Sequence, residues 1–221
     1  MSSHIPSRST RDDRRLFVRL GSVVLGALAQ LRATSAYPRA LMRSLRARLP
    51  GESQLLFALT LVIGVVCGLA AVSFHLAIRT AEAQLIDRAL AARGSSWMIW
   101  TVLTPTLGGL LAGALLTWIV PGARGSGIPQ VKAAYAAEGG RVRFRDALGK
   151  FVIGALQIGS GASLGREGPT VQICAGATSL LARATGLPPR NMRRLTPVGV
   201  AAGIAAAFNA PIAAVTFTIE E

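Results

Sequence analysis

The stretch GSGASLGREGPTVQ, residues 159–172, decides what kind of fold this chain can adopt. It lies between two apolar runs, yet it contains four glycines, a proline and the adjacent charges of Arg166 and Glu167. Glycine and proline interrupt helices, and a charge pair is costly in apolar surroundings. The stretch therefore predicts a break between two short apolar helices, at a point where the charged residues have a function.

Two other segments are long and apolar enough to cross a bilayer. Residues 55–78 and 97–120 contain no ionised group, and the second has tryptophans near both ends. About 20 apolar residues span the hydrocarbon core, and tryptophan is typical of its interfaces. Only 15% of the chain is charged, against about 25% in soluble domains. We therefore expect an all-α integral membrane protein, with the lipid bilayer as a partner.

The remaining apolar sequence is shorter or interrupted. Residues 151–165 and 168–182 are too short to cross a bilayer, and 195–219 contains Pro197 and the Asn209–Ala210–Pro211 step. Backbone groups freed by such breaks must be buried in protein or face water, because lipid cannot bind them. We therefore expect tilted, broken (re-entrant) helices that line a pathway through the membrane.

Basic residues are concentrated before the first span. Residues 1–50 contain ten arginines and two acids. Positive residues favour the cytoplasm, so we expect a cytoplasmic N-terminus, an outer 79–96 loop and an inner 121–146 segment. Residues 1–50 then form a basic cytoplasmic segment with an interfacial helix, in the inner (plasma) membrane; a signal peptide is the alternative. With only 5% aromatic residues, the net charge of +14 favours anionic lipid over nucleic acid.

A soluble dinucleotide-binding domain is the competing interpretation of the glycines. A strand over 151–158 followed by a GxGxxxG loop would need a helix straight after the glycines and an acid about 20 residues later. Here Pro169 follows the glycines, and no acid stands between Glu167 and Glu220. We expect no enzyme, cofactor or metal site. Cys67 and Cys174 are interpreted as small core residues, not as a disulfide or metal pair.

Three motifs carry the functional signal: GSGIPQ at 125–130, GREGP at 165–169 and AAFNAPIAAVTFTIEE at 206–221. Pro129 and Pro169 are typical of a helix's first turn, where a missing N–H is not needed. Helix starts expose N–H groups and a partial positive charge, which suit an anion. Two starts aimed at one point would bind an anion without a full positive charge, so that it can leave again.

In this order and spacing the motifs resemble the first half of the CLC family of chloride channels and transporters. The resemblance covers residues 51–221. It implies a homodimer in which each subunit has its own anion pathway, built from two inverted repeats of tilted, broken helices. It also implies that this chain is the first repeat and that the second is absent from it.

The resemblance assigns roles to individual residues. Glu167 is implied to be the gate, which occupies an anion site when ionised and swings away when protonated. Arg166 is expected to join a structural hydrogen-bond network. The residues implied to bind chloride are Ser126, Gly127 and Ile128, with Gly125 and Pro129 in the same motif. Those implied to surround the gate are Gly165, Arg166, Gly168 and Pro169.

The final acidic pair, Glu220 and Glu221, separates transport mechanisms. In the family's exchangers, the second glutamate of such a pair relays protons, and channels generally lack it. The resemblance therefore implies chloride/proton exchange, with chloride and protons as the transported partners. A passive chloride channel and a truncated remnant without transport are the alternatives.

Overall fold

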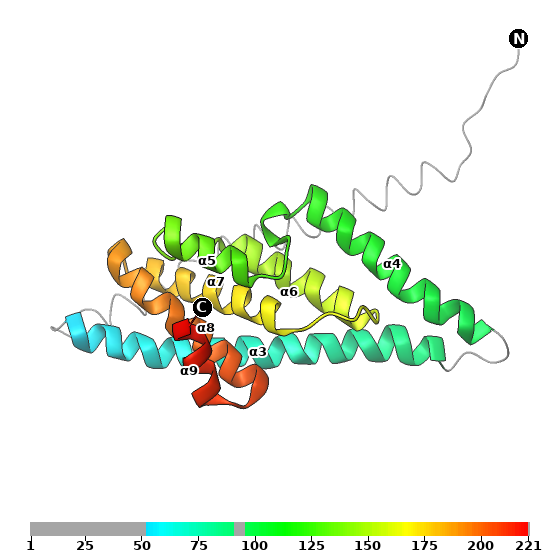
Figure 1. The fold of residues 1–221 in the computed structure, drawn as a ribbon, viewed down its shortest axis with the longest axis horizontal. Helices are drawn as coiled ribbons and strands as arrows, with labels where there is room; N and C mark the ends of the chain where they lie inside the picture. Colours follow the sequence, from blue (N-terminus) through cyan, green and yellow to red (C-terminus); the bar gives the residue numbers. More distant parts are fainter. Residues whose placement is uncertain (1–51, 91–95, 221) are drawn as a thin grey trace, which may run out of the picture. The chain divides into compact units, whose positions relative to one another are not determined.

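The computed structural model describes residues 52–90 and 96–220, and every regular element in them is helical, as predicted (Figure 1). The predicted interfacial helix within 1–50 and the glutamate at position 221 lie outside the described residues. The elements are α3 (Glu52–Leu90), α4 (Ser96–Trp118), the 3-10 helix η1 (Pro121–Ala123), α5 (Ile128–Ala137), α6 (Phe144–Gly159), α7 (Glu167–Ala184), α8 (Pro189–Phe208) and α9 (Pro211–Glu220).

The two predicted spans are helices α3 and α4. By length and composition, residues 53–86 and 97–118 are able to cross a membrane. The expectation of a loop over 79–96 is wrong for its first part, because α3 continues to Leu90. Residues 79–90 include several alanines and leucines and no glycine or proline, so nothing in them ends the helix.

The predicted break between α6 and α7 is present. Helix α6 ends at Gly159, and Gly161 follows with a φ of 98°, a left-handed conformation that glycine adopts without strain. Residues 160–166 form the connection, and α7 begins at Glu167. The charged pair of the connecting motif therefore stands at a helix start, within apolar sequence.

Of the two interruptions predicted within residues 195–219, the one at Pro197 is wrong and the one at Asn209–Ala210–Pro211 is confirmed. Pro197 lies inside α8 and does not end it, because an interior proline removes one backbone hydrogen bond and need only bend the helix. The real break is at Asn209, whose φ of 54° and ψ of 35° are left-handed. Asparagine tolerates this conformation, and Pro211 starts the new helix α9.

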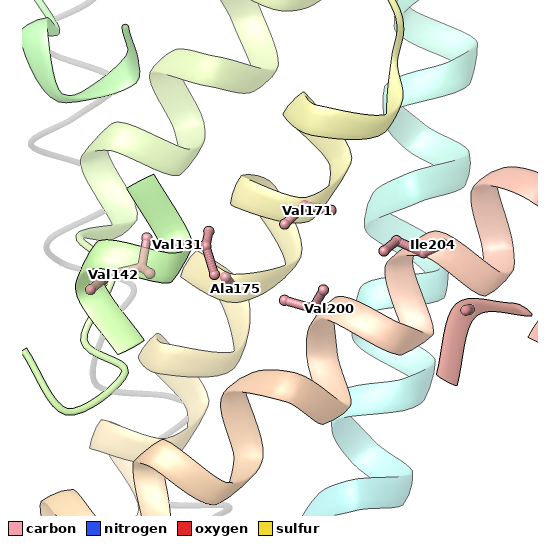
Figure 2. Close-up of a cluster of buried hydrophobic side chains, with 8 residues drawn as sticks. Val131, Val142, Val171, Ala175, Val200 and Ile204 are labelled. Carbon is pink, nitrogen blue, oxygen red and sulfur yellow. The ribbon is translucent and has the colours of Figure 1, made fainter. Parts of the chain in front are cut away.

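Helix α7 lies at the centre of the packing. It packs against α3, α5, α6 and α8. Figure 2 shows one buried cluster, in which Val171 and Ala175 of α7 lie between Val131 of α5 and Val200 of α8. Contacts on every side therefore fix the position of the α7 N-terminus.

The outer helices are apolar on their exposed faces. Leu110 of α4 is 67% exposed and Ile212 of α9 is 84% exposed. Exposed apolar faces of this size are expected where a helix borders lipid or another protein surface.

Candidate anion site at two helix starts

The starts of α5 and α7 touch through their backbones. A Cβ atom on Gly127 would lie 2.3 Å from the carbonyl oxygen of Gly168, and one on Gly168 would lie 2.2 Å from that of Ser126. Only glycine permits this approach at both positions, and the φ of Gly127, 111°, also favours glycine. Two motifs that are far apart in the sequence thus form one site.

At the α5 start, a side chain of the same helix already accepts a hydrogen bond from one of the backbone N–H groups. The backbone N–H of Gly127 donates to Oε1 of Gln130 over 2.9 Å. This hydrogen bond caps the helix from within, so Gly127 is the least available of the three residues implied to bind chloride. The N–H of Ile128 stays in the first turn, where helices have no partner of their own.

A pocket of about 320 Å³ opens beside the two helix starts. Residues of α4, η1 and α6 complete its wall. The motif residues that line it are Gly125, Ser126, Ile128, Gly165, Glu167, Gly168 and Pro169. The structure therefore brings together most of the residues of both motifs that the sequence singled out. Gly127, Pro129 and Arg166 do not line the pocket.

The carboxylate of Glu167 lies close to Gly165 of the same motif. A Cβ atom on Gly165 would lie 2.0 Å from Oε2 of Glu167, so a larger residue there would displace the carboxylate. The side chain is half-buried and lines the pocket. A carboxylate in this place meets the same positive helix start that would attract a free anion, so the two compete.

Arg166 does not line the pocket, and its side chain connects the start of α7 to α3 and α8. Its Nη1 lies 2.8 Å from Nδ1 of His75 on α3, and its Nη2 donates to the carbonyl oxygen of Ala207 on α8 over 3.0 Å. The hydrogen bonds expected of Arg166 are present. Its neighbour Glu167 is therefore held in place by contacts outside the pocket.

Lys150 was not singled out by sequence reasoning, although it lines the pocket. It is 7% exposed, and its ammonium group donates to the carbonyl oxygens of Ala123, at 2.9 Å, and of Gly125. The pocket therefore has a lysine in its wall that the expectation of a site without a full positive charge did not include. The available signal was a lysine, next to Gly149, inside an otherwise apolar run.

Gln172 supports the same loop from the α7 side. The side chain is 2% exposed, and its Nε2 donates to the carbonyl oxygen of Gly122 over 3.1 Å. Together with Lys150 it fixes the backbone between η1 and α5 through carbonyl oxygens.

Glu220, the one residue of the expected proton-relay pair that the structure describes, lies elsewhere. Glu220, at the exposed end of α9, lines a separate pocket of about 460 Å³ between α5, α8 and α9, together with Lys132 and Tyr135. It does not line the pocket of Glu167. Its neighbour at position 221 lies outside the described residues.

Comparison with known proteins identifies the family. The family model described as voltage gated chloride channel matches residues 108–221. The chain is 36% identical over 172 residues to a putative chloride channel protein ClcB-like of Ralstonia nicotianae, a match that covers 75% of this chain and 40% of that protein. It is also 36% identical over 162 residues to the H(+)/Cl(-) exchange transporter ClcA of Cronobacter sakazakii, covering 72% of this chain and 34% of the relative.

Solved structures give the same result. A slow cyanobacterial Cl-/H+ antiporter matches with a TM-score of 0.63 at 29% identity, over 75% of this chain and 40% of that one. A eukaryotic CLC transporter matches with a TM-score of 0.62 at 25% identity, over 81% and 34%. The chain thus spans 34% to 40% of the length of these relatives. Two glycine-rich helix starts that share one pocket, and a family match over that same region, lead to one conclusion: the chain belongs to the voltage gated chloride channel family.

Proposed function

We propose that this chain forms the first repeat of a membrane transporter that exchanges chloride for protons. The observation that carries the proposal is the shared pocket of the GSGIP and GREGP helix starts, with the Glu167 carboxylate in its wall. The names of the ClcA relative and of the cyanobacterial antiporter support exchange over passive conduction.

In this proposal chloride binds at the helix starts. The Ser126 hydroxyl, the N–H groups of the first turns of α5 and α7, and the ammonium group of Lys150 supply the positive end of the interaction. Lys150 already donates to two carbonyl oxygens, which moderates its attraction for the ion. An anion held by these groups is bound firmly enough to enter and weakly enough to leave.

Glu167 acts as the gate. Ionised, its carboxylate takes the place of an anion at the α7 start, and protonated, it no longer competes. Glu221, with Glu220 beside it, relays protons from the cytoplasmic side. We further propose a homodimer in the inner (plasma) membrane, with the N-terminus in the cytoplasm.

The test uses a chimera, because the chain spans only 34% of the ClcA relative. Residues 55–221 replace the matching segment of the Cronobacter sakazakii ClcA protein, and the chimera is purified and reconstituted in liposomes. Chloride efflux and proton uptake are recorded together, with an ion-selective electrode and a pH electrode. We expect both ions to move in opposite directions at a fixed ratio.

Glu167→Gln in the chimera should keep chloride efflux and abolish proton uptake, because the amide cannot exchange a proton. Glu138→Gln is the matched control, since Glu138 is an exposed carboxylate at the end of α5. Chloride efflux without proton uptake in the unmodified chimera would establish a passive channel instead. A chimera that melts cooperatively yet moves neither ion would favour the remnant without transport.

A further inference from the structure

The chain's two cysteines meet between α3 and α7. The thiol Sγ of Cys67 lies 3.6 Å from the carbonyl oxygen of Cys174, and the Sγ of Cys174 lies 3.6 Å from the carbonyl oxygen of Cys67. Both residues are 0% exposed, and both are free thiols. The contact joins positions 107 apart in the sequence, so local patterns in the sequence give no sign of it.

The contact is reciprocal, which matters for its chemistry. Each sulfur lies beside the carbonyl oxygen of the opposite cysteine, so both thiols take part in one contact between α3 and α7. A disulfide needs two backbones that approach closely, with side chains directed toward one another. The reciprocal contacts show the close approach of the two backbones, since each sulfur lies 3.6 Å from the carbonyl oxygen of the other cysteine.

Helix α8 also borders the cysteine pair, and it has a glycine at the point of contact. Gly203 of α8 stands against Cys174, and a Cβ atom at position 203 would lie 2.5 Å from its Sγ. Thr178, one turn along α7, donates to the carbonyl oxygen of Cys174 over 2.8 Å and lies 3.6 Å from the Sγ of Cys67. Small residues of α7 and α8 thus lie beside the two sulfurs.

We propose that Cys67 and Cys174 form a redox site, which a small neutral peroxide converts into an intramolecular disulfide. One cysteine sulfur attacks a peroxide oxygen, giving a sulfenic acid and, once the departing oxygen takes a proton, one water. The second sulfur then attacks the sulfenic sulfur, and the hydroxyl leaves as a second water. Two thiols are oxidised by two electrons in total, and one hydrogen peroxide is reduced to two waters.

The burial of the pair sets which reagents can reach it. Buried cysteines react slowly, and charged or bulky reagents cannot enter an apolar helix interface. Hydrogen peroxide is small and uncharged, so it can reach the sulfurs without unfolding the protein. The second thiol stands beside the first, which favours disulfide formation over further oxidation of the sulfenic acid. A dithiol reductant reverses the reaction by exchange.

The disulfide would tie α3 to the helix that carries the gate. Cys174 lies about two turns after Glu167 on α7. The bond would hold the α7 start against α3 and restrict its movement. This consequence for transport rests on the proposed function, whereas disulfide formation does not.

The experiment uses the purified 221-residue chain in lipid nanodiscs. It is treated with hydrogen peroxide, freed of peroxide with catalase, denatured in SDS, alkylated with N-ethylmaleimide and weighed by intact mass spectrometry. We expect monomers that have lost two hydrogens and carry no maleimide, and chymotryptic peptides that join Cys67 to Cys174. Treatment with dithiothreitol after the peroxide step and before alkylation should restore two maleimide additions.

Cys67→Ala and Cys174→Ala are the matched controls. Each keeps one thiol in the same place, so peroxide should give no intramolecular loss of two hydrogens. Oxidation should also raise the thermal unfolding midpoint of the unmodified chain and leave that of both variants unchanged.

Three results would overturn the proposal: two maleimide additions after peroxide, disulfide-linked dimers as the main product, or sulfinic acid at either cysteine without a disulfide. The transport consequence is tested separately in the ClcA chimera. Disulfide formation there with unchanged chloride efflux would reject control of the gate, and the redox site itself would stand on the mass measurement alone.

Discussion

Nη1 of Arg166 lies 2.8 Å from Nδ1 of His75, and this contact joins the residue before Glu167 to helix α3. Arginine has only donors, so Nδ1 must be the acceptor and His75 carries its proton on Nε2. The second guanidinium nitrogen binds the carbonyl oxygen of Ala207 on α8. The α7 start is therefore held from α3 and α8 at once, through one side chain.

Replacing His75 with alanine should destabilise the protein. The change removes the acceptor for Nη1 of Arg166, a hydrogen bond to a charged group worth about 1.5 to 3 kcal/mol. His75→Gln offers another acceptor and should lose less. Val72→Ala serves as the control, because Val72 lies on the same helix and is 52% exposed. Circular dichroism during thermal unfolding in detergent gives the unfolding midpoint of each of the three variants. Equal midpoints for His75→Ala and the unmodified chain would contradict a stabilising contact.

Lys150→Met should lower stability while keeping most of the side-chain volume. The carbonyl oxygens of Ala123 and Gly125 lose their donor, and an unsatisfied buried polar group costs about 1 to 3 kcal/mol. Removing a buried cation recovers some desolvation, so we expect the lower part of that range. Arg194→Met is the control, because it removes a positive charge from an exposed position of α8. A midpoint at or above that of Arg194→Met would show that the lysine is not a structural support.

Local patterns in the sequence were sufficient to predict much of the fold. Two long apolar runs predicted α3 and α4, and glycines with a proline predicted the break before Glu167. These features depend on residues close in sequence, where backbone preferences act. The end of α3 was misplaced because an apolar run marks the membrane-spanning part of a helix and not the end of its hydrogen bonding.

The sequence predicted the two helix starts of the candidate site, but not the residues that support them. The motifs indicated the helix starts, but the contacts of Lys150 with Ala123 and of His75 with Arg166 join distant parts of the chain. Such contacts depend on how helices pack, and a single sequence carries no direct sign of them. The cap that Gln130 gives to Gly127 is local, and a polar residue three positions after a helix start was a usable signal.

Asp146 should make stability depend on pH in the acid range. It lies in the first turn of α6, outside the two spanning helices, with its carboxylate against Gly122. Burial raises the pKa of this carboxyl above its ordinary 3.8, Arg143 and Arg145 oppose the rise, and Glu138 adds to it. The folded state then holds the proton at a pH where the unfolded state has lost it.

The sign of the effect follows from that difference. Asp146 favours folding below pH 3.8, and the contribution is lost as the pH rises through the raised pKa of the folded state. The side chain of Asp146→Asn cannot titrate, so it lacks this pH-dependent contribution. As the pH increases from about 3.8, the unfolding midpoint of the unmodified chain should therefore fall relative to that of the variant. Melting curves at several acid pH values test this. A difference that is constant with pH would refute the assignment to Asp146.

The backbone approach between Gly168 and Ser126 gives the last prediction. Gly168→Ala adds a methyl group 2.2 Å from the carbonyl oxygen of Ser126, which is backbone and cannot rotate away. The two helix starts must then separate, at a cost of about 1 to 3 kcal/mol. We expect a lower unfolding midpoint and, in the ClcA chimera, weaker chloride efflux, because the two starts no longer face the same pocket.

Gly109→Ala separates this steric effect from the general effect of replacing a glycine in a helix. Gly109 lies inside α4, and a Cβ atom there would meet no atom within 4 Å. The same methyl group should therefore stabilise the helix by about 0.5 to 1 kcal/mol. Opposite shifts of the unfolding midpoint in the two variants would show that backbone contact between Gly168 and Ser126 is what requires glycine. If both variants were stabilised, the α5 and α7 starts would not be in contact, and the shared pocket that supports anion binding would lose its basis.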